Sequence, residues 1–167
     1  MSRSFEVPFE SPASVEQVHA AFSDEDYWLA RFAAFGADST LDSLSVDADG
    51  TVTVNVTQHL GRQLLPGLIA KLVPGDLRVL HSETWRPVGD REVHGQVSVS
   101  APAALGSGRG RARLTPSGAG SRMEFSATVE FNVPLIGGKV EGFVARQFAE
   151  GIPDIQRFTT DWIVGHP

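Results

Sequence analysis

A histidine and a glutamate one residue apart are the strongest candidates for chemistry in this chain. His81 and Glu83 lie in the segment 77–88, and Trp85 follows at the same spacing. Alternate residues of a strand point to the same face, so the imidazole, carboxyl and indole groups would lie side by side. Such a pair could bind a ligand hydroxyl or carbonyl group, or exchange protons with a substrate. If Glu83 is buried among apolar neighbours, we expect its pKa to be raised, because burial disfavours the charged form.

The turn after this strand decides where the pair points. A two-residue turn at Gly89-Asp90 places Glu83 opposite Gln96, within a polar stripe on the solvated face. A three-residue turn over 89–91 turns His81 and Glu83 into an apolar interior instead. It sets them in a mostly apolar row with Val93, Gly95, Val97 and Val99. A slip of one residue exchanges the two faces of a strand. We favour the solvated stripe and keep the interior arrangement as the alternative.

Other reactive groups give little support for catalysis. The absence of cysteine excludes disulfides, thiolate catalysis and cysteine metal sites. The five histidines are scattered and none forms a pair four residues apart, so we expect no metal site and no cofactor. No segment resembles a nucleophile elbow or a catalytic triad.

Three arginines at alternate positions form a basic ridge. Arg109, Arg111 and Arg113 would share one face of a strand. A basic ridge can attract phosphate, but such rows are more often a solvated face, and we favour that interpretation. The formal net charge of −6 also argues against nucleic acid as a partner.

Length and composition predict one globular domain over residues 1–167. Hydrophobic residues make up 41% of the chain and charged residues 20%, which is typical of globular proteins. The first residues lack the apolar stretch of a signal peptide, and no run approaches the roughly 20 apolar residues of a membrane span. We therefore expect a soluble, cytoplasmic protein.

Patterning predicts a strand, two short helices and a series of strands. Residues 4–9 alternate as a strand, and Ser11 with Pro12 has the character of a helix start. Residues 23–26 are typical of a second helix start, which Gly36 would end. Further strands are expected around 41–46, 51–57, 77–88, 92–100, 108–116 and 122–133. The apolar segment 64–73, within 61–75, could be a short helix, a lid or a dimer contact.

The last part of the chain has the pattern of one long amphipathic helix. Apolar residues keep helical spacing from about 138 to 164. Gly151 and Pro153 fall in the middle of it, and proline removes a backbone hydrogen bond there. We predict a kink at this point, with the ligand cavity opening beside it.

The order of these elements resembles the START-like superfamily, also called the helix-grip or polyketide-cyclase-like group. Two local motifs add to the resemblance and are similar to a branch of uncharacterised function. They are Glu-Thr-Trp-Arg-Pro at 83–87 and Val-Pro-Leu-Ile-Gly-Gly-Lys-Val-Glu at 133–141. The resemblance implies an α+β helix-grip fold, in which a bent antiparallel sheet of six or seven strands packs across the long C-terminal helix.

The resemblance also implies a cavity between sheet and helix that holds a lipid, polyketide or steroid-like molecule. A strongly bent sheet that one helix cannot fill leads to the same expectation. The residues that we expect to line this cavity are Trp28, Phe32, Val54, Val56, His81, Glu83, Trp85, Phe125, Val129, Phe143, Gln147, Ile155 and Phe158.

Three functions remain open at this point. The favoured one is carriage or sensing of an apolar small molecule. The second is a cyclase, hydrolase or isomerase in the same cavity, with His81 and Glu83 as acid and base. The third is a structural module that pairs with a second copy of the chain through 64–73.

Overall fold

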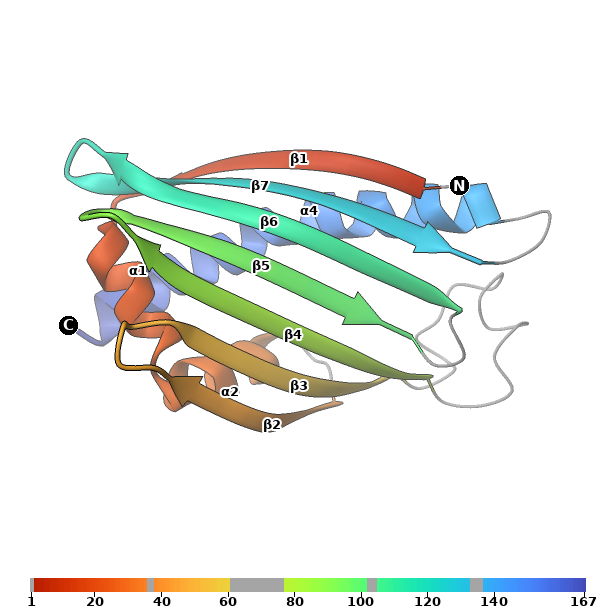
Figure 1. The fold of residues 1–167 in the computed structure, drawn as a ribbon, viewed down its shortest axis with the longest axis horizontal. Coiled ribbons are helices and arrows are strands. Elements are labelled where there is room, and N and C mark those ends of the chain that lie inside the picture. Colours follow the sequence, from red (N-terminus) through yellow and green to blue (C-terminus); the bar gives the residue numbers. More distant parts are fainter. Residues whose placement is uncertain (1, 36–37, 61–76, 102–104, 133–136) are drawn as a thin grey trace.

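Seven antiparallel strands form one sheet that bends around a long helix in the computed structural model of the chain (Figure 1). The structure describes residues 2–35, 38–60, 77–101, 105–132 and 137–167. The strands are β1 (Ser2–Ser11), β2 (Asp38–Val46), β3 (Val52–Leu60), β4 (Leu77–Val88), β5 (Glu92–Ser100), β6 (Gly106–Ser117) and β7 (Gly120–Phe131). Their spatial order is β1-β7-β6-β5-β4-β3-β2. The first strand therefore pairs with the last, and all other paired strands are consecutive in the sequence. The predicted helix-grip architecture is confirmed.

The β4–β5 hairpin adopts the three-residue turn. Val88 pairs with Glu92, which leaves 89–91 as the turn, and Glu83 therefore lies opposite Val97. The favoured prediction of a solvated polar stripe was wrong, because Glu83 is only 3% exposed. A two-residue turn would have placed His94 and Gln96, in place of apolar residues, beside the inward-facing residues of β4. The three-residue turn buries the apolar row of β5 instead, and this burial favours it.

Two short helices follow β1, and the sequence predicted the start of the second correctly but not that of the first. Helix α1 (Val15–Phe22) begins at Ser14, whose hydroxyl accepts a hydrogen bond from the backbone N–H of Gln17, while the Gln17 side chain accepts one from the N–H of Ser14. The predicted start at Ser11 was wrong, since a complete capping box three residues later is the stronger signal. Helix α2 (Glu25–Ala34) starts at Asp24, within the predicted region. The predicted stop at Gly36 lies outside the described residues.

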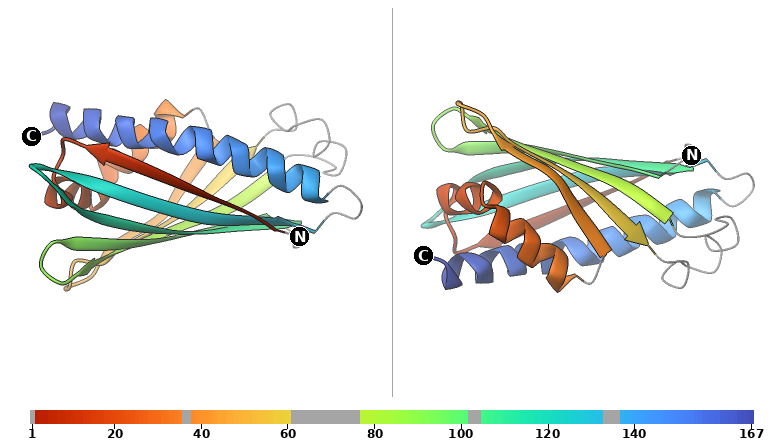
Figure 2. Two further views of the ribbon diagram at one scale, coloured as in Figure 1. Left: turned by 90° about the horizontal axis from the view of Figure 1, so that it is seen from above. Right: turned by 90° about the horizontal axis from the view of Figure 1, so that it is seen from below.

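Helix α4 (Gly137–Gly165) runs across the open side of the sheet, along β1 and β7 (Figure 2). It continues through Pro153, and the kink there stays a prediction. Near its start the buried carboxyl group of Glu141 accepts a hydrogen bond of 2.9 Å from the backbone N–H of Phe131. This contact ties the helix to the end of β7. The segment 64–73 lies outside the described residues.

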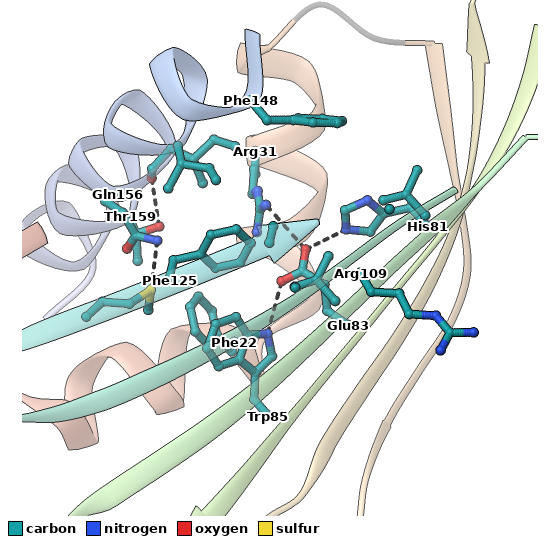
Figure 3. Close-up of a pocket in the computed structure, with 18 of the residues that line it drawn as sticks. Phe22, Arg31, His81, Glu83, Trp85, Arg109, Phe125, Phe148, Gln156 and Thr159 are labelled. Carbon is teal, nitrogen blue, oxygen red and sulfur yellow. Dashed lines mark hydrogen bonds and ion pairs between the residues drawn. The ribbon is translucent and has the colours of Figure 1, made fainter. Parts of the chain in front are cut away.

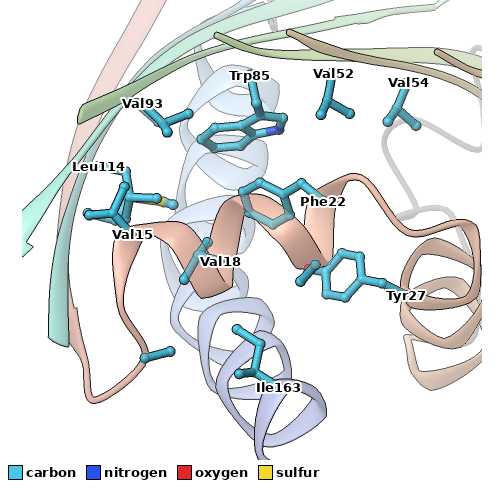
Figure 4. Packing of buried hydrophobic residues seen from close by; sticks show 14 of the residues in the cluster. Val15, Val18, Phe22, Tyr27, Val52, Val54, Trp85, Val93, Leu114 and Ile163 are labelled. Carbon is cyan, nitrogen blue, oxygen red and sulfur yellow. The ribbon is translucent and has the colours of Figure 1, made fainter. Parts of the chain in front are cut away.

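The hydrophobic core fills one end of the space between sheet and helices. Helices α1 and α2 lie between the sheet and the C-terminal part of α4, and Figure 4 shows Phe22 between Trp85 and Tyr27, with its ring tilted against both. Helices α1 and α2 lie at this end, and the rest of α4 continues along β1 and β7.

The Trp85 ring lies directly over Gly95, which pairs with it across β4 and β5. A β-carbon at Gly95 would lie 2.4 Å from Cζ3 of the ring. Replacing Gly95 with alanine should therefore displace the indole and lower the free energy of unfolding by about 1–3 kcal/mol. Gly108→Ala is the matched control, because its nearest side-chain atom would lie at an ordinary 3.5 Å. Equal stability of both variants in urea would contradict this packing.

Candidate functional site

Two adjoining cavities lie between the sheet and α4, and Figure 3 shows side chains that line the inner one. The inner cavity has a volume of about 120 Å³ and the outer cavity about 430 Å³. Apolar side chains dominate both linings. The residues that line both cavities, and so mark their junction, are Arg31, His81, Val99, Gly108, Val129, Phe148 and Ile155. The outer volume alone falls in the range of small-molecule sites.

A buried carboxylate is the centre of the polar groups in the inner cavity. The Trp85 indole N–H donates to Oε1 of Glu83 at 3.0 Å, and Nε2 of His81 lies 2.7 Å from Oε2. Nη2 of Arg31 reaches the same Oε2 at 3.3 Å. Figure 3 shows Arg31 and His81 converging on Glu83 from two sides. We call these four residues the Glu83 cluster.

The Arg31 charge determines the ionisation of Glu83. Burial alone would raise the pKa of this carboxyl group, but the Arg31 guanidinium and the hydrogen bonds from His81 and Trp85 outweigh burial and lower the pKa to about 2. The expected raised pKa was therefore wrong, because no partner for the carboxyl had been identified. Glu83 is ionised at neutral pH and does not supply a proton.

Ionised Glu83 also fixes the tautomer of His81. A carboxylate only accepts hydrogen bonds, so Nε2 of His81 must carry the hydrogen in their 2.7 Å contact. Glu83 thus orients the imidazole ring and favours a proton on Nε2, because a hydrogen bond from one ring nitrogen sets the tautomer.

Arg31 is held on three sides at the junction of the cavities. Its guanidinium carbon lies 4.9 Å from the centre of the Trp28 ring, a cation–π contact. Tyr27 and Glu83 are its polar neighbours, and the side chain of Arg31 is 14% exposed. Burial raises the pKa of Tyr27 despite the nearby arginine, and the phenol lies 2.6 Å from the hydroxyl of Thr159. Helices α2 and α4 are thereby connected through a buried polar contact beside the site.

The structure divides the predicted lining residues into three groups. The inner cavity contains His81, Glu83, Trp85, Phe125, Val129 and Ile155. The outer cavity adds Phe32, Phe143 and Gln147. The predictions that fail to reach either cavity lining are Trp28, Val54, Val56 and Phe158, which pack in or against the core instead. Trp28, Val54 and Val56 belong to the same core cluster as Phe22 of α1, and Phe158 packs against that cluster.

Several lining residues were missed, above all Arg31, together with Tyr27, Phe148 and Thr159. Arg31 had a usable signal. It follows Tyr27 by four residues and Trp28 by three, so a helix brings all three to one face. A charged residue on the buried, aromatic face of an amphipathic helix indicates a buried partner.

The pH dependence of stability should report the buried carboxylate. The pKa of Glu83 is about 2 against an ordinary value of 4.5. Its contribution is therefore present above pH 4.5 and is lost as the pH falls toward 2, and it amounts to roughly 3 kcal/mol. Urea unfolding of Glu83→Gln should show a shallower loss of stability over this range than the wild type, while exposed Glu16→Gln should follow the wild type. Parallel curves for all three proteins would contradict the assignment.

Other candidate chemistry gains no support in the described part of the chain. No group of three or more histidine and acidic side chains could hold a metal ion there. Arg109, Arg111 and Arg113 are exposed on the outer face of β6, as favoured, and Arg113 pairs with Glu92 at 2.8 Å. None of the described helices is long and apolar enough to cross a membrane.

Solved structures confirm the START-like fold. A START superfamily protein of Mycobacterium smegmatis is similar over 98% of this chain and 99% of its own, with a TM-score of 0.58 and 10% identity. A protein of Thermus thermophilus, TTHA0849, covers 98% of both chains with a TM-score of 0.59 and 16% identity. Norcoclaurine synthase of Thalictrum flavum, solved with dopamine and hydroxybenzaldehyde, covers 100% of this chain and 89% of its own, at a TM-score of 0.50 and 16% identity.

The chain belongs to the family described as "Protein of unknown function (DUF2505)", whose model matches residues 6–163. The uncharacterized protein Rv0481c of Mycobacterium tuberculosis is 39% identical over 99% of both chains. The uncharacterized protein Mb0491c of Mycobacterium bovis matches equally well. The predicted resemblance to START-like proteins is confirmed at the level of the fold, and the family is one of uncharacterised function, as predicted.

Proposed function

We propose that this protein binds an apolar small molecule, of lipid, polyketide or steroid-like character, in the joined cavities beneath α4. One observation carries the proposal: an apolar space of ligand size adjoins the buried polar groups of the Glu83 cluster. We further propose that the protein is cytoplasmic. Pairing with a second copy of the chain stays a prediction.

Native mass spectrometry of gently purified protein tests this proposal. We expect a retained apolar compound, or a rise in melting temperature with members of a lipid and polyketide library. A protein that retains nothing and responds to no compound would refute the proposal.

A substitution at the junction should block binding. Val99 lines both cavities, so the larger side chain in Val99→Phe should fill their junction and lower the affinity for the ligand at least about ten-fold. Overpacking should also lower the free energy of unfolding by about 1–3 kcal/mol. Ser98→Val, on the opposite face of the same strand, should leave binding unchanged. Unchanged binding in Val99→Phe, measured by the same thermal shifts, would place the ligand elsewhere.

The His81–Glu83 pair supports a second candidate function, an isomerase, cyclase or hydrolase that uses the same cavity. Because Glu83 is ionised and bonded through both oxygens, His81 would be the acid–base group and Glu83 a positioning residue. His81→Asn should then retain the ligand but abolish its conversion. If wild-type protein leaves its retained compound unaltered, the catalytic candidate fails and the binding proposal stands.

A further inference from the structure

The hydrogen-bond acceptors that line the inner cavity already have donors within the protein. Both oxygens of Glu83 already accept hydrogen bonds, Oε1 from Trp85 and Oε2 from His81, and Oε2 also forms an ion pair with Arg31. The Tyr27 hydroxyl lies 2.6 Å from that of Thr159, which itself donates to the carbonyl of Ile155. The acceptors of the cluster are thus largely occupied by protein donors.

Arg31 has donor capacity beyond these partners. A guanidinium group carries N–H donors on three nitrogens, and Nη2 is the atom that reaches Glu83. Arg31 lines both cavities among mostly apolar neighbours and is nearly buried. Tyr27 takes a further hydrogen bond from Arg31. An apolar ligand in the cavities would keep water from the remaining donors, and a donor left without an acceptor is costly, so a ligand that brings an acceptor to this point gains more than one that does not.

The charges at the junction decide which acceptor fits. The charges of Arg31 and Glu83 cancel each other. Arg109 also lines the inner cavity, but its side chain is exposed to water on the outer face of β6. A ligand carboxylate would add a negative charge next to Glu83 where few waters can screen it, and an ammonium group would meet Arg31. An uncharged oxygen acceptor satisfies the arginine without either penalty.

From this balance we propose that the ligand is an apolar carbonyl compound, a ketone or ester, whose oxygen accepts a hydrogen bond from Arg31 while its hydrocarbon body fills the cavities. This inference rests on the proposed function and adds to it the chemical class of the ligand and the residue that selects it.

Matched probes test the selection. 2-Acetylnaphthalene should bind at least about ten-fold more tightly than 2-isopropylnaphthalene, of nearly the same shape, and than 2-naphthoate. 2-Undecanone should likewise exceed undecanoate. Affinities follow from the shift of the Trp85 indole N–H resonance, which lies beside the site. With a ¹³C-labelled carbonyl, the infrared stretch of the bound ketone should fall in frequency, because a hydrogen bond weakens the C=O bond.

The double variant Arg31→Met with Glu83→Gln removes the guanidinium without leaving an unpaired charge. It should bind the ketone about as weakly as the hydrocarbon, without the infrared shift, whereas Arg111→Gln, which changes an exposed side chain outside both cavities, should behave as the wild type. Wild-type protein that binds ketone, hydrocarbon and carboxylate equally, or prefers the carboxylate, overturns this inference and leaves the proposed function intact. If none of the probes binds, both fail.

Discussion

Replacing Arg31 with methionine is expected to lower the free energy of unfolding by about 3–5 kcal/mol, because it leaves the Glu83 carboxylate buried without its countercharge. The two side chains are 14% and 3% exposed, so water replaces little of the lost interaction. Adding Glu83→Gln to the same protein removes the orphaned charge and should recover more than half of the loss. Urea unfolding of the two single variants and the double variant measures this coupling as a double-mutant cycle.

An exposed ion pair provides the control. Arg122 pairs with Glu10 and Glu124 on the surface, and its side chain is 40% exposed. Arg122→Met should cost less than about 1 kcal/mol. A similar cost at both arginines, or a double variant less stable than Arg31→Met alone, would show that the buried pair does not couple as the distances indicate.

Replacing Phe22 with alanine is expected to cost about 3–5 kcal/mol, since a fully buried aromatic ring is lost and its neighbours cannot collapse into the space. The Phe22 ring centre lies 4.5 Å from that of Trp85, 5.6 Å from Tyr27 and 5.9 Å from Trp28. The ring therefore joins α1 to the sheet and to α2 at the edge of the inner cavity. Urea unfolding at constant m-value measures the loss.

Phe35 is the matched control for this prediction. Its side chain is 44% exposed, and it touches Phe158 edge-on at 5.8 Å. Phe35→Ala should cost less than about 1 kcal/mol, because most of the ring already contacts water. Equal losses in the two variants would mean that the aromatic cluster around Phe22 is not the packed centre of the domain.

The sequence predicted the elements well because their signals are local. Alternation placed His81, Glu83 and Trp85 on one face of β4, and helical spacing found α4 to within a residue at each end. It could not choose the hairpin register after β4, since both turn lengths are compatible with Gly89-Asp90. The choice depends on burial of residues from β5, β6 and α4 together, which no local pattern contains.

The same limit explains the errors at the site. Val54 and Val56 were correctly assigned to the inner face, but whether an inward side chain meets a ligand or a helix depends on where α1 and α2 pack. Arg31 was overlooked because a charged residue in an amphipathic helix is usually solvated. Its partner Glu83 lies 52 positions later in the chain, and only the tertiary structure brings the two together.

Nuclear Overhauser contacts between the protein and bound 2-acetylnaphthalene test the central claim, that the cavities beneath α4 bind an apolar molecule, most directly. The proposal predicts contacts from the ligand ring protons to the methyl groups of Val99, Val129 and Ile155, which line both cavities. It predicts none to Val15 and Val52, which lie in the packed core. Contacts confined to residues outside the two cavities, or none at saturating ligand, would contradict it.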